Sequence, residues 1–180
     1  MAEMRLSPFA ALVVMPLVAI DKCECNPSHP ETMQARECSL CQEAEKKSAA
    51  PGIFLLKDNN PRKPNRWLAL PRAHGPGPHR LIDMTKAERT ELWRVAIAKA
   101  AEMWGDEWGV AYNGDKVRTQ CHAHIHIGKL LKGIETGNFV VVRGPAEIPV
   151  PSGTGLWVHP HGKRLHVHLD EQTTETVLLR

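Results

Sequence analysis

The chain has 180 residues, a formal net charge of +3 and 42% hydrophobic residues. This length suits one domain with a core of its own, and the small net charge gives no reason to expect nucleic-acid binding. Five cysteines are too few for a disulfide scaffold, and their number is odd.

An apolar segment from Leu6 to Ile20 opens the chain. At about 15 residues it is too short for a transmembrane helix and has the length of a signal-peptide core. Two interpretations stay open. Residues 1–22 form a signal peptide with a cleavage site near Val18-Ala19, or they form an apolar strand or helix of the domain. The protein is accordingly exported or cytoplasmic.

The middle of the chain predicts two strands, a helix and two further strands. Thr85 and Glu88 form a capping box for the helix, and Asn113-Gly114 marks a tight turn. This order predicts an α+β domain with an antiparallel sheet and one main helix packed on a face of it. The predicted strands cover residues 53–57, 66–70, 109–112 and 120–130, the helix continues to about residue 104, and a short helix starts near residue 38.

The last 50 residues predict a β extension, residues 131–180, packed on the main domain of residues 23–130. It contains a strand at 139–143, a Pro/Gly-rich loop at 145–155, and a hairpin formed by 156–159 and 164–169. The hairpin carries His159, His161, His166 and His168. We expect these histidines to be exposed, and a weak second metal site is the less favoured alternative.

Three histidines alternate with apolar or small residues in the segment Cys121-His122-Ala123-His124-Ile125-His126-Ile127. On a strand, alternate side chains share a face, so the three imidazoles are expected to point the same way. A strand face that carries three imidazoles is too polar to pack well in a hydrophobic core. Imidazole does suit nucleophilic attack, proton transfer and metal binding near pH 7. The pattern therefore predicts an active site.

The residues around this pattern resemble the histidine triad (HIT) superfamily. An Asn-Gly turn and Thr119-Gln120 precede the histidines, and an upstream Asp58 is followed by Pro71-Arg72-Ala73-His74. The resemblance runs from about Cys38 to Lys129 and implies a HIT-like sheet. Gly52–Asp58 and Arg118-Thr119-Gln120 resemble the CDP-diacylglycerol hydrolase branch, whereas Cys38-Ser39-Leu40-Cys41 and Pro71–His74 resemble zinc-bearing hydrolases and uridylyltransferases.

This resemblance implies roles for individual residues. His124 is the expected nucleophile, which forms a covalent phospho-histidine intermediate, and His126 donates to the phosphate or the leaving group. The His122 carbonyl fixes the tautomer of the nucleophile. The remaining implied contacts to substrate come from Gln120, Thr119, Asn113, Arg118 and Asp58, the last as a ribose-hydroxyl acceptor. From the residues alone, Asp58 can equally be a turn residue and Arg118 a solvated one.

A structural zinc is expected from Cys38-x-x-Cys41, which has metal-ligand spacing. The resemblance completes the site with His74 and His122. Alternatives remain: a four-sulfur site that adds Cys23 and Cys25, participation of His29, or disulfides if the chain is exported. Cys121 alternates away from the histidine face and is expected to be a buried small hydrophobe.

The sequence thus predicts a hydrolase of nucleotide phosphoesters or phosphoanhydrides, with a CDP-lipid as one candidate substrate. A nucleotidyltransferase or phosphorylase is the first alternative, and a non-catalytic zinc- and nucleotide-binding module is the second. We expect membrane association only if the substrate is a lipid. A homodimer is also expected, because the helix carries Trp93, Ile97, Ala101 and Trp104 on a second apolar face beside Leu92, Val95, Ala96 and Met103.

Overall fold

A computed structural model describes residues 20, 23–46, 52–73, 75–134 and 138–180. The predictions for the N-terminal apolar segment, apart from Ile20, and for His74 lie outside these residues. Within the described part of the chain, no helix is long and apolar enough to cross a membrane.

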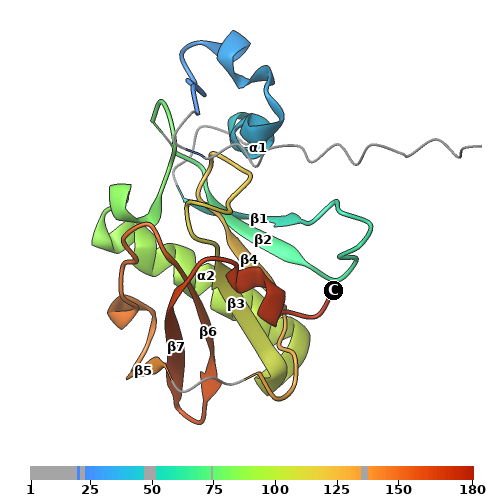
Figure 1. The fold of residues 1–180 in the computed structure, drawn as a ribbon, viewed down its shortest axis with the longest axis vertical. Helices are drawn as coiled ribbons and strands as arrows, with labels where there is room; N and C mark the ends of the chain where they lie inside the picture. The colour runs from blue at the N-terminus through green and yellow to red at the C-terminus, as the bar shows by residue number, and fades with distance from the viewer. Residues whose placement is uncertain (1–19, 21–22, 47–51, 74, 135–137) are drawn as a thin grey trace, which may run out of the picture.

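One seven-stranded sheet organises the molecule, and every neighbouring pair in it is antiparallel. The strand order is β1-β2-β4-β3-β6-β7-β5, so the C-terminal hairpin β6–β7 joins the same sheet beside β3 (Figure 1). The strands are β1 (Ile53–Lys57), β2 (Trp67–Pro71), β3 (Trp108–Tyr112), β4 (Ile125–Lys129), β5 (Phe139–Val142), β6 (Gly155–His161) and β7 (Arg164–Glu171).

The main helix, α2 (Lys86–Trp104), has the ends that the sequence predicts. The Glu88 N–H donates to Thr85 Oγ1 at 3.3 Å, and the Thr85 N–H donates to Glu88 Oε2 at 2.7 Å, which forms the expected capping box. Gly105 ends the helix with a φ of 56°, a conformation that glycine adopts without strain. The α+β class with an antiparallel sheet and one main helix is therefore confirmed. A shorter helix, α1 (Ser39–Glu45), precedes the sheet.

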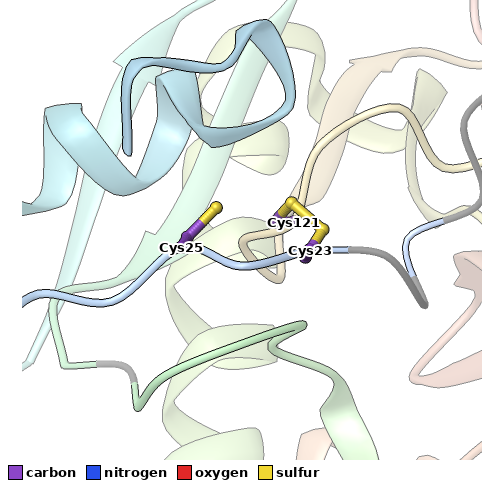
Figure 2. A group of neighbouring side chains, drawn as sticks. All are labelled: Cys23, Cys25 and Cys121. Atoms are coloured by element: carbon purple, nitrogen blue, oxygen red, sulfur yellow. A yellow bond between two sulfur atoms is a disulfide. The ribbon is translucent and has the colours of Figure 1, made fainter. Parts of the chain in front are cut away.

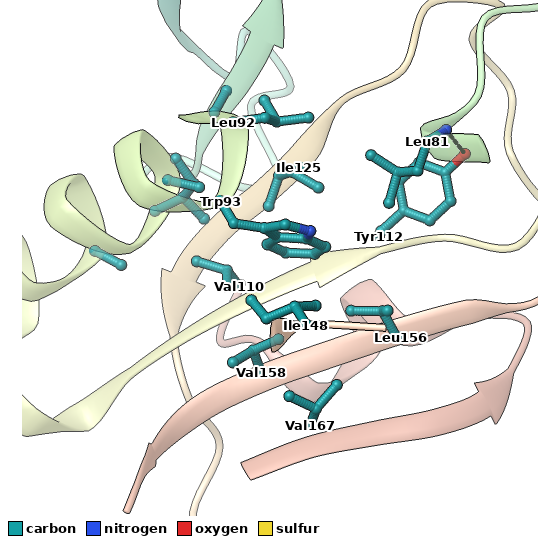
Figure 3. Packing of buried hydrophobic residues seen from close by; sticks show 14 of the residues in the cluster. Leu81, Leu92, Trp93, Val110, Tyr112, Ile125, Ile148, Leu156, Val158 and Val167 are labelled. Carbon is teal, nitrogen blue, oxygen red and sulfur yellow. Dashed lines mark hydrogen bonds between the residues drawn. The ribbon is translucent and has the colours of Figure 1, made fainter. Parts of the chain in front are cut away.

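The hydrophobic core lies between α2 and one face of the sheet (Figure 3). Trp93 is only 1% exposed and packs in a cluster that also contains Ile148, which follows the 3-10 turn η6 (Pro145–Glu147). Met103, which was expected on the buried face, is 43% exposed instead. The helix therefore buries Trp93 within its own chain, and the expectation that Trp93 belongs to an uncovered second face is wrong.

The C-terminal segment covers part of the opposite face of the sheet. The 3-10 turn η7 (Thr174–Val177) lies on the side away from α2 (Figure 1), and Leu178 is buried in a cluster with Ala111 and Trp157. Gly109 permits this close approach, because a Cβ there would lie 2.6 Å from a Leu178 methyl carbon. This segment consequently reaches the face of the sheet that carries His126.

Candidate active site

His124 lies immediately before β4, whose first residue is Ile125. The predicted strand over residues 120–130 thus starts too early, and residues 121–124 form bends and irregular chain. His124 Nδ1 is 2.9 Å from the His122 carbonyl oxygen. A carbonyl only accepts, so Nδ1 carries the proton and donates it. Nε2 of the neutral ring therefore keeps its lone pair, which is the arrangement that a nucleophile needs.

The environment keeps both site histidines neutral. His124 is 5% exposed and His126 is 6% exposed, and their rings meet edge-on with centroids 4.8 Å apart. Burial lowers the pKa of His124 to about 3, and the neighbouring His126 adds to the effect. Burial likewise lowers the pKa of His126 to about 4. Near pH 7 each ring can therefore accept a proton or attack an electrophile.

Asn113 fixes the orientation of His126. The Asn113 Oδ1 accepts from the Glu175 N–H at 3.0 Å and from Thr174 Oγ1 at 3.2 Å, so the other amide atom is Nδ2. This Nδ2 is 3.3 Å from His126 Nε2 and 3.3 Å from Glu175 Oε1, and it donates to both. The neutral His126 ring therefore has its proton on Nδ1, on the side that faces Glu175.

Glu175 is the carboxylate of the site. Its Oε2 lies 3.6 Å from His126 Nδ1 and 3.7 Å from an Arg66 nitrogen, and it also pairs with Lys63 Nζ. Burial opposes the ionisation of Glu175, but His126, Lys63 and Arg66 outweigh it and hold its pKa at about 2. The site thus contains a permanent negative charge with two cations beside it.

Arg66 holds the C-terminal segment in place. Its side chain is 2% exposed, Nε donates to the Leu179 carbonyl at 2.8 Å, and Nη2 donates to the carbonyls of Glu175 and Leu178. These carbonyls belong to η7 and the residues after it, where backbone acceptors lack helical partners. Sequence reasoning missed Glu175, Lys63 and Arg66. They lie in the tail and in a polar loop, and their only signal is their charge.

Three of the residues expected to contact substrate, namely Gln120, Asp58 and Thr119, have other surroundings in the structure. The Gln120 Oε1 accepts from Ser39 Oγ and the Leu40 N–H at 2.8 and 3.2 Å, so Gln120 holds the start of α1. Asp58 accepts from the Asn60 N–H at 2.9 Å as a turn residue. Thr119 is exposed.

Arg118 is buried rather than solvated. It is 2% exposed and donates to the His79 carbonyl at 2.8 Å, and its guanidinium lies over the Tyr112 ring at 5.2 Å. Among the polar residues predicted for the site, the structure brings together the His122 carbonyl, Asn113, His124 and His126.

Hydrogen bonds from three segments surround the backbone before His122. The Cys121 N–H donates to the Glu37 carbonyl at 2.8 Å, and the Cys121 carbonyl accepts from the His79 N–H at 2.9 Å. His122 Nε2 donates to the Pro71 carbonyl at 2.7 Å, and its ring lies 5.1 Å from that of His79. Because the His122 carbonyl orients His124, these contacts support the position of His124 indirectly.

Two disulfides reinforce the same region and overturn the expected zinc site. Cys23 is bonded to Cys121 (Figure 2), and Cys25 is bonded to Cys38. Cys38 therefore has no thiolate to offer, and burial raises the pKa of the Cys41 thiol to about 11, so that it stays protonated. The expected site of Cys38, Cys41, His74 and His122 does not fit this structure. Cys121 is buried, as expected, and its sulfur is bonded to that of Cys23.

Two groups of side chains among the described residues are close enough to hold a metal ion: Cys23, Cys25 and Cys121, and His159, His166 and His168. The first group is engaged in disulfides, whereas the second consists of imidazoles. A metal is therefore better matched to the histidine group than to the cysteines.

A cavity of about 250 Å³ adjoins His122 through Pro71 and His79. Several of its lining residues are apolar, among them Ile53, Met84 and Ala87. A second cavity of about 590 Å³ shares His79 and Met84 with it. Both cavities are lined by His79, whose ring lies 5.1 Å from that of His122, and His124 is not among the residues that line them.

No family model matches the chain, and no curated protein matches it.

Proposed function

We propose that the chain is a HIT-type hydrolase that cleaves nucleotide phosphoanhydrides or phosphoesters through a covalent intermediate on His124. The observation that carries this proposal is the hydrogen bond from His124 Nδ1 to the His122 carbonyl at 2.9 Å. It leaves the Nε2 lone pair available in a ring whose pKa is lowered to about 3. A neutral imidazole with one oriented lone pair is a competent nucleophile toward phosphorus.

In the first step, His124 Nε2 forms a bond to phosphorus, and the bond from phosphorus to the leaving oxygen breaks. The positive charge that develops on the His124 ring is stabilised by the His122 carbonyl, which still accepts from Nδ1. Because both site histidines are neutral near pH 7, the site favours a leaving group that needs no proton. A phosphate leaving group satisfies this condition, which favours a nucleoside diphosphate ester over a simple alkyl ester.

In the second step, a water oxygen attacks phosphorus and the nitrogen–phosphorus bond breaks, which restores the lone pair of His124. His126 is a neutral base beside it, and its Nε2 accepts the proton of the water in place of the hydrogen bond from Asn113 Nδ2. Glu175 lies 3.6 Å from His126 Nδ1 and stabilises the resulting imidazolium. Lys63 pairs with Glu175, and its side chain is 20% exposed. It is therefore the cation that can leave Glu175 and bind a phosphate oxygen of the substrate instead.

The cavity beside His122 supports a substrate that carries an apolar group. Its walls include Ile53, Met84 and Ala87, so the portion of the substrate that does not react can be apolar. A CDP-lipid is one compound with a phosphoanhydride and such a group. We expect a nucleotide ester as ligand and membrane association only with a lipid substrate.

The test is a brief incubation of the protein with a panel of nucleoside diphosphate esters in water enriched in oxygen-18. We expect release of a nucleoside monophosphate, and intact-mass spectrometry should detect a covalent adduct that disappears in His124→Ala. Incorporation of oxygen-18 into the released phosphate group identifies water as the acceptor. Absence of both adduct and product across the panel would refute the proposal, and transfer to added inorganic phosphate would identify a phosphorylase.

A further inference from the structure

Three histidines of the β6–β7 hairpin gather on the sheet face opposite α2. His159 pairs directly with His166 across the hairpin, and His168 pairs with Trp157, so all three share this face. They are 7%, 4% and 0% exposed, respectively. The expectation of exposed hairpin histidines is therefore wrong for these three, although His161 is exposed as expected.

The ring nitrogens of this group have the spacing of metal ligands. One nitrogen from each of the three rings lies within 4.8 Å of the others, and the Nε2 atoms of His159 and His168 are 3.2 Å apart. A tetrahedral zinc with bonds of about 2.0–2.1 Å places its nitrogen ligands about 3.3 Å apart. Two of the three imidazoles thus already have this separation, and a ring nitrogen of His166 lies within 4.8 Å of both.

The tautomer of His159 also fits a ligand. Its Nδ1 is 3.1 Å from the Pro160 carbonyl, to which it must donate, so its Nε2 carries a lone pair on the side of His168. Metal-binding histidines commonly donate their other ring proton to a backbone carbonyl in this way.

Aromatic contacts hold the other two rings. His168 stacks on Trp157 with centroids 3.6 Å apart and planes 3° apart, and Trp157 is itself fixed by donation from Nε1 to Glu171 at 3.0 Å. His166 stacks on Phe139 with centroids 4.2 Å apart. Rings with fixed planes lose little freedom when a metal binds.

We propose that His159, His166 and His168 bind one transition-metal ion of the Zn²⁺, Cu²⁺ or Ni²⁺ class, with a water molecule in the fourth position. Imidazole is a preferred ligand of these ions. The site does not depend on the proposed hydrolase activity. Cross-strand neighbours place His126, Ala111, Trp157 and His168 in one row across β4, β3, β6 and β7, three strand spacings or about 14 Å from end to end.

The proposal is tested by titrating the metal-free, full-length protein with Co²⁺ and following the visible bands of tetrahedral cobalt. We expect saturation at one equivalent. His159→Gln, His166→Gln and His168→Gln should each weaken binding at least tenfold, since each removes one of three ligands. His29→Gln is the matched control, because His29 is exposed and lies outside the group, whereas His161 stacks on His166 with centroids 3.9 Å apart. This variant should bind cobalt like the unaltered protein.

A second measurement does not depend on the folding of any variant. The electron paramagnetic resonance spectrum of the unaltered protein with one equivalent of Cu²⁺ should show hyperfine coupling to three nitrogens. His124→Gln should leave this spectrum unchanged, which separates the site from the triad. Failure to bind Co²⁺ at micromolar concentrations, equal loss in His29→Gln, or loss of the copper signal in His124→Gln would each overturn the proposal.

Discussion

At the scale of single residues, the proposed chemistry depends on His124. We expect His124→Ala to lower kcat by a factor on the order of a thousand or more, because this variant lacks the oriented lone pair that is proposed to form the bond to phosphorus. The dissociation constant of a non-hydrolysable substrate analogue should change less than about tenfold, since the nucleophile contributes little to ground-state binding. His126→Ala should reduce kcat less severely. Steady-state kinetics and calorimetric binding measure the two effects separately.

His161→Ala is the control for this comparison, because it removes an exposed histidine of the C-terminal hairpin. It should leave kcat unchanged. If His124→Ala lost binding and turnover equally, or kept its activity, the assignment of the nucleophile would be wrong.

The buried histidines also determine how stability depends on pH. In the unfolded chain a histidine binds a proton near pH 6.5, whereas His124 and His126 bind theirs near pH 3 and 4 in the folded protein. Between these values the unfolded state holds more protons, so the free energy of unfolding decreases as the pH falls below about 6.5. Glu175, with a folded pKa of about 2 against 4.5, adds a further loss below pH 4.5.

We therefore expect the melting temperature to decrease steadily from pH 6.5 to pH 4. In His126→Gln, which cannot be protonated, the decrease over this interval should be shallower. Calorimetry at a series of pH values measures both slopes. Parallel slopes for the two proteins would show that His126 is not buried in its neutral form.

Sequence reasoning identified the histidines because their alternation is local, but it could not find their partners. Asn113 comes from the same turn–strand segment and was predicted. Glu175 is 49 positions after His126 and reaches it only because the chain returns across the sheet. Gln120 was assigned to phosphate from its position beside the triad, yet its amide is used by the N-terminal end of α1. The position of Gln120 beside the histidines therefore did not determine which groups its amide contacts.

At the scale of elements, the C-terminal segment around η7 is part of the candidate site, and Arg66 keeps it there. Arg66→Lys should retain the charge but lose the fork of donors to the carbonyls of Glu175, Leu178 and Leu179. We expect faster hydrogen exchange at residues 174–179 and a lower kcat, because Glu175 is no longer held beside His126. Mass spectrometry of peptic fragments reports the exchange.

The matched control is Arg143→Lys, which alters an exposed arginine paired with Glu147 on the other side of the core. Exchange at residues 174–179 should be normal in this variant. Unchanged exchange in Arg66→Lys would mean that packing of Leu178, rather than Arg66, retains the segment.

The ends of helices and strands were predicted correctly where they depend on residues close together in the sequence. The ends of α2 follow from Thr85, Glu88 and Gly105, which act within one turn of the helix. The start of β4 could not be predicted in the same way, because pairing with β2 begins only at Ile125 opposite Ala69. The residues before it are held by a disulfide and by hydrogen bonds to distant segments, which leave no trace in the alternation of side chains.

At the scale of the whole molecule, the homodimer remains a prediction. Trp93 is buried, so an interface between two chains would have to be formed by other residues. That side chain is buried against Ile148 in a single chain, so Trp93→Glu should unfold the monomer rather than only dissociate a pair. Light scattering at micromolar concentration measures the mass directly. A mass near 20.1 kDa would refute the homodimer.

The two disulfides connect the N-terminal segment to the sheet, and they predict how the whole molecule responds to reduction. Cys23 and Cys121 are separated by 98 positions, whereas Cys25 and Cys38 are separated by 13. In the chain-entropy description the longer loop contributes about 4–5 kcal/mol and the shorter about 3 kcal/mol. For a protein of this size, about 1 kcal/mol corresponds to roughly 2–4 °C in Tm.

We therefore expect the double variant Cys23→Ser/Cys121→Ser to lower Tm by roughly 10 °C or more, and Cys25→Ser/Cys38→Ser by less. The first pair should also lower kcat, because Cys121 precedes the residue whose carbonyl orients His124. Cys41→Ala is the control, since it removes a sulfur without opening a disulfide.

The denatured protein, without reductant, should expose one thiol per chain to a colorimetric reagent, that of Cys41. Five thiols, together with bound zinc that is lost in Cys38→Ser but kept in His168→Gln, would show instead that Cys38 and Cys41 hold a metal. The same titration therefore decides between an oxidised scaffold and a zinc-bound one around the residues that support His122.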